Sequence, residues 1–157
     1  MNRREARLQL SVMCEPGDPR LPPLLARRDP AELVELIKAG RSVDGRALPQ
    51  AWVHAAQGSA AEVERTRALA DADGLRWIIP GDRAWPERLN DLDHAPPNSS
   101  SGGAPLGLWV RGAGSLAELA ERSVSIVGAR DCTAYGAEQA AEIAADAGSA
   151  GFTVVSG

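Results

Sequence analysis

The sequence predicts an α/β protein, in which a small helical domain over residues 1–75 is followed by the beginning of a parallel sheet over residues 76–157. Two observations carry this prediction. Apolar residues recur at helical spacing through the first half, between start and stop signals. Residues 123–157 read as a strand, a helix and a second strand with short links. One such unit leaves a strand edge unpaired and a face of the sheet poorly covered, so we expect the sequence to be truncated within the sheet.

The bulk composition is that of a soluble globular protein. The chain has 157 residues, of which 44% are hydrophobic and 24% charged, and a formal net charge of -4. This balance does not by itself indicate a nucleic-acid-binding protein. Arg130 is the only basic side chain in residues 123–157, so an anion there would be bound locally, by backbone N–H groups and one arginine.

The sequence also indicates the cellular location of the protein and whether it binds a metal or a cofactor. No apolar run approaches the roughly 20 residues of a membrane span, and the N-terminus lacks the apolar core of a signal peptide. Cys14 and Cys132 have no metal-ligand spacing and are expected as free thiols in a reducing cytosol. We therefore expect a cytoplasmic protein with no membrane association, no metal and no cofactor.

Four helices are predicted before residue 75. The first covers about residues 4–13, although the spacing of its apolar residues also fits a strand. The second has the clearest signals, because Asp29 can cap it, Pro30 suits its first turn and Gly40 can end it. The third spans about residues 48–56.

The fourth helix opens with Ser59 and Glu62 at the spacing of a capping box and closes at Gly74. Shorter signals follow it. They predict strands at 77–79 and 106–110, a helical turn at 85–89, a flexible loop at 98–103 and a short helix start at Ser115.

The last unit gives the strongest structural signal. Val124, Ile126 and Val127 predict a strand, and Gly128 after them is expected to let the backbone turn sharply. A helix is predicted over about residues 136–147 and a second strand over 152–155. Short links between these elements predict a right-handed unit with parallel strands.

Ligands of open α/β sheets bind beyond the carboxyl ends of the strands. Residues 128–130 follow the first strand and residues 156–157 follow the second, so both segments are expected at those ends. The N-terminus of the helix between the strands adds free N–H donors, so phosphate is the expected ligand. Arg130 could bind it with two parallel hydrogen bonds, Thr133 could add a hydroxyl, and Tyr135 could stack on a base or pack under the helix. The candidate site residues are Gly128, Ala129, Arg130, Thr133, Tyr135, Gly136, Ser156 and Gly157.

Structural readings stand beside the functional ones. Gly128 could serve the turn alone, and Arg130 could pair with Asp131 or Glu138 at the surface. Cys132 has no base partner nearby in the sequence, since both histidines lie in other segments, so no catalytic residue is predicted. The dinucleotide fingerprint G-x-G-x-x-G is absent, which argues against NAD.

Taken together, these elements resemble the DNA-processing protein A family, DprA or Smf. Its pattern is an apolar strand, G-[SA]-R, Y-G, an alanine-rich helix and V-V-S-G. The matching stretch here is SVSIVGARDCTAYGAEQAAEIAADAGSAGFTVVSG. Upstream, IIPGDRAWPERLNDLDHAPP and PLGLWVRG resemble the segments that precede the sheet in that family.

The resemblance implies a SAM-like (sterile-alpha-motif-like) helical domain, followed by the start of a Rossmann-like domain. It implies a protein without turnover chemistry that binds single-stranded DNA, loads the RecA recombinase and acts in DNA uptake and natural transformation. Arg130 would contact phosphate, and the neighbouring candidate residues would shape the pocket. The full-length form would be a homodimer, with much of its dimer surface and further basic residues downstream of residue 157.

Other functions stay open at this point. Related Rossmann-like sheets occur in nucleotide-binding proteins and in phosphoribohydrolases that cleave nucleoside monophosphates. Those enzymes need a downstream glycine-rich loop and a catalytic glutamate, which are not visible in this sequence. A third reading is a non-functional truncated remnant that keeps only the N-terminal interaction module.

Overall fold

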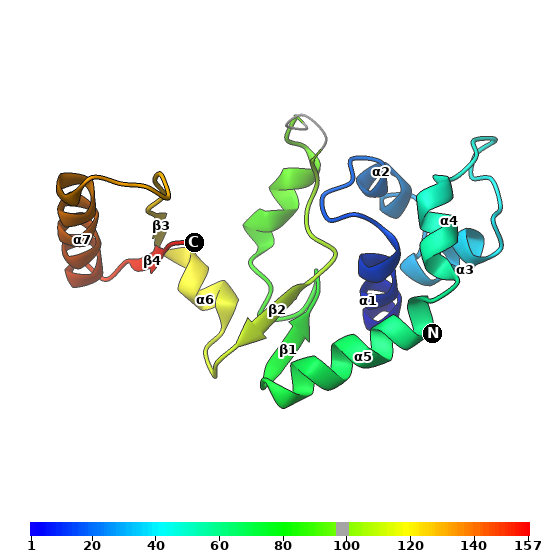
Figure 1. The fold of residues 1–157 in the computed structure, drawn as a ribbon, viewed down its shortest axis with the longest axis horizontal. Helices are drawn as coiled ribbons and strands as arrows, with labels where there is room; N and C mark the ends of the chain where they lie inside the picture. The colour runs from blue at the N-terminus through cyan, green and yellow to red at the C-terminus, as the bar shows by residue number, and fades with distance from the viewer. Residues whose placement is uncertain (97–100) are drawn as a thin grey trace. The chain divides into compact units, whose positions relative to one another are not determined.

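Helices dominate the first part of the chain and short strands follow (Figure 1). The computed structural model describes residues 1–96 and 101–157, and these form two units, unit 1 (Met1–Ala113) and unit 2 (Gly114–Gly157). The predicted α/β class is confirmed. The units divide after Ala113, and the domain boundary predicted after residue 75 remains a prediction.

Unit 1 contains α1 (Arg3–Met13), α2 (Leu21–Leu25), α3 (Pro30–Lys38), α4 (Gln50–Ala56), α5 (Ser59–Ala72), β1 (Leu75–Ile78), the 3-10 helix η1 (Glu87–Asp93) and β2 (Leu108–Arg111). Unit 2 contains α6 (Leu116–Glu121), β3 (Ser123–Ser125), α7 (Ala134–Ser149) and β4 (Thr153–Val155).

The core of unit 1 is built around α1, which packs against α3, α4 and α5. Leu10 of α1 and Leu33 of α3 are fully buried, and Trp52 of α4 is 1% exposed. These residues belong to one apolar cluster. Complete burial of an aliphatic side chain stabilises a fold by about 1.5–3 kcal/mol, so this cluster holds the helices together.

Two helix starts follow from local chemistry. The Asn2 side chain caps α1 by accepting from the Glu5 N–H, and the Glu5 carboxylate accepts from the Asn2 N–H, so the segment that also fitted a strand is a helix. Asp29 caps α3 by accepting a hydrogen bond of 2.8 Å from the Ala31 N–H. Pro30 occupies the first turn of α3, where its missing N–H has no cost, so this predicted start is confirmed.

Two details of the predicted helices are wrong. The Ser59–Glu62 capping box does not form, because the Ser59 hydroxyl donates to the Ala56 carbonyl and accepts from Gln9 Nε2, at 2.9 and 3.0 Å. Ser59 is thereby buried as a tertiary contact between α5 and α1. The short helix α2, of sequence LPPLL, was not predicted. Its prolines lie in the first turn, the one part of a helix that tolerates them.

The predicted central strands form β1 and β2, which pair antiparallel. Trp77 lies opposite Trp109, and the two ring centroids are 4.9 Å apart. Gly107 allows the backbone to cross close to the Trp77 ring, because a Cβ there would lie 2.4 Å from Cζ2. The predicted loop at 98–103 lies partly outside the described residues.

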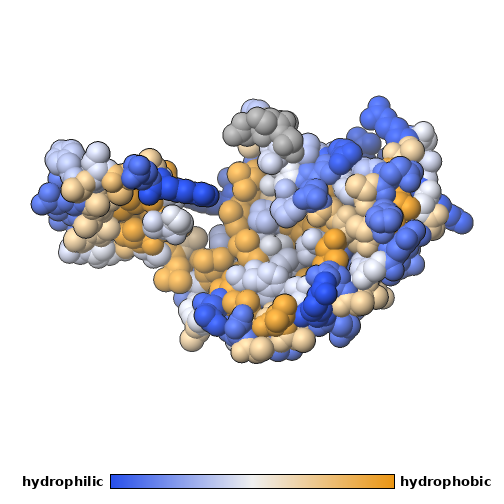
Figure 2. Space-filling model, viewed as in Figure 1, coloured by the Kyte–Doolittle hydropathy of each residue, from blue (hydrophilic) through white to orange (hydrophobic). Residues whose placement is uncertain are grey.

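In unit 2, β3 and β4 pair in parallel, as predicted, with Ser123 opposite Thr153. Arg122 completes the unit, since its guanidinium lies 4.9 Å from the Phe152 ring centroid and donates to the Ala150 carbonyl. None of the described residues of unit 2 is buried. Ile143 of α7 is 54% exposed, and Figure 2 shows apolar side chains at the surface over this helix. Unit 2 therefore has little apolar core of its own.

One ion pair in unit 1 gives a pH-dependent prediction. The Asp18 carboxylate accepts hydrogen bonds of 2.8 and 2.5 Å from Nε and Nη2 of Arg20. These bonds hold the pKa of Asp18 below its usual value. A group whose pKa is lowered by folding adds stability above its unfolded pKa, about 3.9, and loses it as the pH falls through the folded value.

We therefore expect Asp18→Asn to lower the free energy of unfolding by about 1–3 kcal/mol near neutral pH. The difference between the two proteins should shrink as the pH falls below about 4, since protonated Asp18 also lacks the charge. Urea denaturation near pH 7 and near pH 3 measures both values. A difference of the same size at both pH values would show that the charge of Asp18 is not what stabilises unit 1.

Candidate functional site

The carboxyl ends of β3 and β4 meet at one edge of the small sheet. Ser125 is opposite Val155, and the Ile126 N–H donates to the Val155 carbonyl at 2.9 Å, so the pairing continues one step past β3. Residues 128–130 leave β3 at this edge, and residues 156–157 leave β4 there. Both predicted segments therefore follow the same edge of the sheet, and Figure 1 shows the two strands that they leave, β3 and β4, side by side.

Helix α7 begins with a cap that defines its free donors. Thr133 is the N-cap residue, and its Oγ1 accepts a hydrogen bond of 3.1 Å from the Gly136 N–H. The N–H groups of Ala134 and Tyr135 belong to the first turn and have no partner within the helix. Thr133 thus serves the helix as an acceptor, while its O–H remains a donor for a ligand.

Gly136 lies next to the capping oxygen. A Cβ at this position would lie 3.4 Å from Thr133 Oγ1, which is a normal van der Waals contact, and the φ of Gly136 is not positive. The cap of α7 therefore does not by itself require a glycine in the Y-G pair.

The sharp turn predicted at Gly128 is wrong. Its φ does not lie in the left-handed region that favours glycine, and a Cβ there would meet no described atom within 4 Å. The backbone at the end of β3 does not need glycine for its own conformation. The missing side chain instead leaves this backbone open to whatever approaches from solvent.

Arg130 is exposed and makes no hydrogen bond or ion pair with any described residue. The alternative in which it pairs with Asp131 or Glu138 is not observed. All five N–H donors of its guanidinium are therefore available, in the fork geometry that matches a phosphate or a carboxylate.

Tyr135 is 70% exposed, so the alternative in which its ring packs under α7 is wrong. Val127 at the end of β3 is 85% exposed. Ser156 and Gly157 are also exposed. The edge thus presents one guanidinium, one phenol ring and free backbone groups to solvent.

The net charge of unit 2 is negative and does not attract an anion over a long range. Unit 2 contains two arginines and six acidic residues, which give it a net charge of -4. A bound anion would depend on short contacts with Arg130 and the helix N-terminus, because long-range attraction is absent.

Other chemistry was also searched for in residues 1–96 and 101–157. Cys132 is exposed and Cys14 is buried, and both are free thiols. These residues contain no group of three or more His, Cys, Asp and Glu side chains that could hold a metal. Within the same ranges no helix has both the length and the apolar character needed to cross a bilayer.

The parallel pairing of β3 and β4, with α7 as the connection between them, is the beginning of a Rossmann-like sheet. Within the class of Rossmann-like proteins the chain belongs to the DNA recombination-mediator protein A family, whose family model matches residues 76–157.

Curated relatives agree with this assignment. The putative DNA processing proteins DprA of two Mycobacterium tuberculosis strains, CDC 1551 / Oshkosh and H37Rv, are each 32% identical to the chain over 155 residues. The match covers 94% of this chain and 38% of each relative, so the chain spans well under half of their length. No solved structure matches the chain.

Proposed function

We propose that the chain contributes a single-stranded DNA-binding edge to a recombination mediator of the DprA type. The observation that carries the proposal is the exposed guanidinium of Arg130, which follows the carboxyl end of β3 and has no hydrogen bond or ion pair with a described residue. Arg130 precedes Ala134, the first residue of α7, by four positions. Family membership supports a role in DNA recombination. The names of the mycobacterial relatives support DNA processing.

We propose a role for each group at the edge. Arg130 would form two parallel hydrogen bonds with one phosphate. The N–H groups of Ala134 and Tyr135, with the Thr133 hydroxyl, would hold the same or the next phosphate. The open backbone from Gly128 to Ala129 on one side, and Ser156 with Gly157 on the other, would form the walls.

The exposed ring of Tyr135 favours a single strand over a duplex. In a duplex both faces of each base are covered by its neighbours, whereas an unstacked base can lie on an aromatic ring. Contacts to phosphate and stacking are both tolerant of sequence, so we propose binding without strong sequence preference. Loading of RecA, action in DNA uptake and natural transformation, a cytoplasmic location and a homodimeric full-length form complete the proposal.

The test is binding of a fluorescent oligothymidylate to the chain at several salt concentrations, followed by anisotropy. Each phosphate neutralised on a single strand contributes about -0.7 to the slope of log affinity against log salt. We expect a slope of about -0.7 to -1.4 and weaker binding of a duplex of the same length. Equal affinity for the duplex, or no dependence on salt, would contradict the proposal. The rate of RecA filament formation on single strands, with and without the chain, tests loading separately.

The substitution Gly128→Val tests whether this glycine is needed for folding or for the approach of a ligand to the backbone. Because its Cβ would have open space and its backbone has no positive φ, we expect the free energy of unfolding to change by less than about 0.5 kcal/mol. The new methyl groups would stand on the backbone where a phosphate approaches, so affinity for the oligonucleotide should fall by about tenfold, or about 1.4 kcal/mol. Gly128→Ala should give an intermediate loss. A Gly128→Val chain that fails to fold would show that the turn, and not access, requires the glycine.

A further inference from the structure

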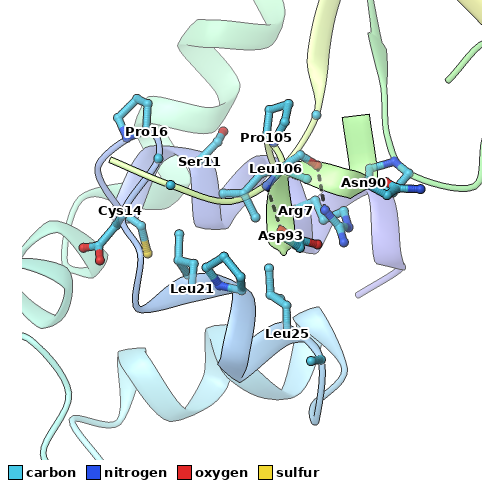
Figure 3. A pocket seen from close by; sticks show the side chains of 18 of the residues that line it. Arg7, Ser11, Cys14, Pro16, Leu21, Leu25, Asn90, Asp93, Pro105 and Leu106 are labelled. Carbon is cyan, nitrogen blue, oxygen red and sulfur yellow. Dashed lines mark hydrogen bonds between the residues drawn. The ribbon is translucent and has the colours of Figure 1, made fainter. Parts of the chain in front are cut away.

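Unit 1 holds a cavity of about 850 Å³ that the proposed DNA-binding edge does not include. It lies along one side of α1 and is bordered by α2, η1 and the segment that leads into β2, as Figure 3 shows. Its walls are mostly apolar, with rings or aliphatic groups from Leu21, Pro22, Leu25, Trp77, Pro105, Leu106 and Trp109. A volume of this size with apolar walls and a few polar groups is typical of a small-molecule site.

Arg7 of α1 points into this cavity and is 8% exposed. Its only hydrogen bond with a described residue runs from Nη1 to the Leu106 carbonyl, at 3.0 Å. Its Nε is buried without a partner among the described residues. A buried guanidinium with one of five donors used is costly unless a counter-charge is present. Burial lowers the pKa of Arg7, and so does the neighbouring charge of Arg3.

A second arginine stands beside Arg7. Arg3 lies four residues earlier, so both side chains emerge on the same face of α1, and both line the cavity. Arg3 makes no ion pair or hydrogen bond with the described residues. Two like charges side by side, one of them buried, form the environment that an anionic group would neutralise.

The acidic residues on the cavity wall are already engaged. Asp93 accepts the Ala104 N–H at 2.7 Å, and its charge partly offsets that of Arg7. The Asp18 carboxylate is bound by Arg20. A third, Glu87, accepts from an asparagine amide. The remaining one, Glu15, follows the C-terminal end of α1, eight residues after Arg7 and so about 12 Å further along the helix axis.

We propose that this cavity binds a small aromatic anion, a planar ring carrying one phosphate, carboxylate or sulfonate group, with the anionic group between Arg3 and Arg7. The ring would lie against the apolar wall that Trp77 and Trp109 share. The site belongs to unit 1 alone, and it stands whether or not unit 2 binds DNA.

The first experiment titrates the whole chain with two probes of matched shape. One is 8-anilino-1-naphthalenesulfonate, an aromatic anion, and the other is its uncharged counterpart N-phenyl-1-naphthylamine. The readout is quenching of tryptophan fluorescence, since all four tryptophans lie in unit 1 and two of them line the cavity. We expect saturable binding at one site, with the sulfonate at least tenfold tighter than the amine. Equal affinities for both probes would overturn the proposal.

Variants then locate the anionic group. Arg3→Gln changes an exposed side chain and should weaken the sulfonate about tenfold without affecting the neutral amine. Arg41→Gln, an equal loss of charge at an exposed residue outside the cavity wall, should change neither. Arg7→Met should remove the preference for the sulfonate while the melting temperature stays the same or rises, because a buried charge that Asp93 only partly offsets is gone. A sulfonate affinity that Arg3→Gln leaves unchanged would overturn the proposal.

Competition identifies the chemistry of the natural anion. Deoxyadenosine 5′-monophosphate carries a phosphate on an aromatic base, and 1-naphthoate carries a carboxylate on an aromatic ring. Displacement of the sulfonate probe by the first supports a nucleotide-like ligand, and displacement by the second supports an aromatic carboxylate. If neither displaces the probe, the cavity does not bind aromatic phosphates or carboxylates, and that part of the proposal is overturned.

Discussion

Replacement of Trp52 by alanine is expected to lower the free energy of unfolding of unit 1 by about 3–5 kcal/mol. Trp52 is 1% exposed and belongs to the apolar cluster formed with α1 and α3. The Arg20 guanidinium lies 5.1 Å above the centre of its ring, so the same side chain also supports the Asp18 ion pair. Truncation would remove the burial of a large ring and leave a cavity that the helices cannot fill without moving.

Guanidinium denaturation followed by far-ultraviolet circular dichroism measures this loss, because the helices of unit 1 dominate that signal. Leu69→Ala is the matched control. Leu69 is 63% exposed on α5, so its truncation should cost less than about 0.5 kcal/mol. If Trp52→Ala lowers the free energy of unfolding by less than about 1 kcal/mol, α4 is not a fixed part of the core.

Elements whose signals are local could be predicted from the sequence. The start of α3 was predicted because Asp29, Pro30 and the apolar spacing after them agree on one boundary. The parallel pairing of β3 and β4 followed from the connection through a helix, which restricts the topology. Both predictions needed only neighbouring residues.

Features that depend on distant contacts could not be predicted in this way. Ser59 has the spacing of a capping box, but Gln9, fifty residues earlier, binds its hydroxyl instead. The short helix α2 was missed because prolines weigh against a helix until their place in its first turn is known. The conformation of Gly128 also depends on how the chain continues toward α7, which the residue type alone does not show.

In the candidate site, too, local features could be predicted from the sequence and features that depend on surrounding residues could not. The rule that ligands bind beyond strand ends predicted which edge to examine. Whether Arg130 is paired and whether Tyr135 is covered depended on their surroundings, and the structure leaves both side chains open to solvent. The cavity in unit 1 gave no sequence signal, because the isolation of Arg7 arises from segments about a hundred residues apart in the chain.

The second large effect is expected at Arg130. Arg130→Ala should weaken binding of single-stranded DNA by about 1–3 kcal/mol, or about 5- to 150-fold. Arg130 is the one basic residue in the sequence of residues 123–157, so no other side chain of this segment can replace its contact with phosphate. Because it makes no hydrogen bond or ion pair with the described residues, its removal should leave the stability of unit 2 unchanged.

Two control variants distinguish a specific phosphate contact from general attraction by charge. Arg130→Lys keeps the charge but loses the fork, so a bidentate contact predicts an affinity between those of the wild type and Arg130→Ala. Arg83→Ala removes the same charge from an exposed residue of unit 1 and should have little effect. The slope of log affinity against log salt should become less negative by about 0.7 for Arg130→Ala, the contribution of one phosphate contact. If Arg130→Ala and Arg83→Ala lower the affinity equally, general charge attracts the strand, and the edge of β3 and β4 is not the binding site.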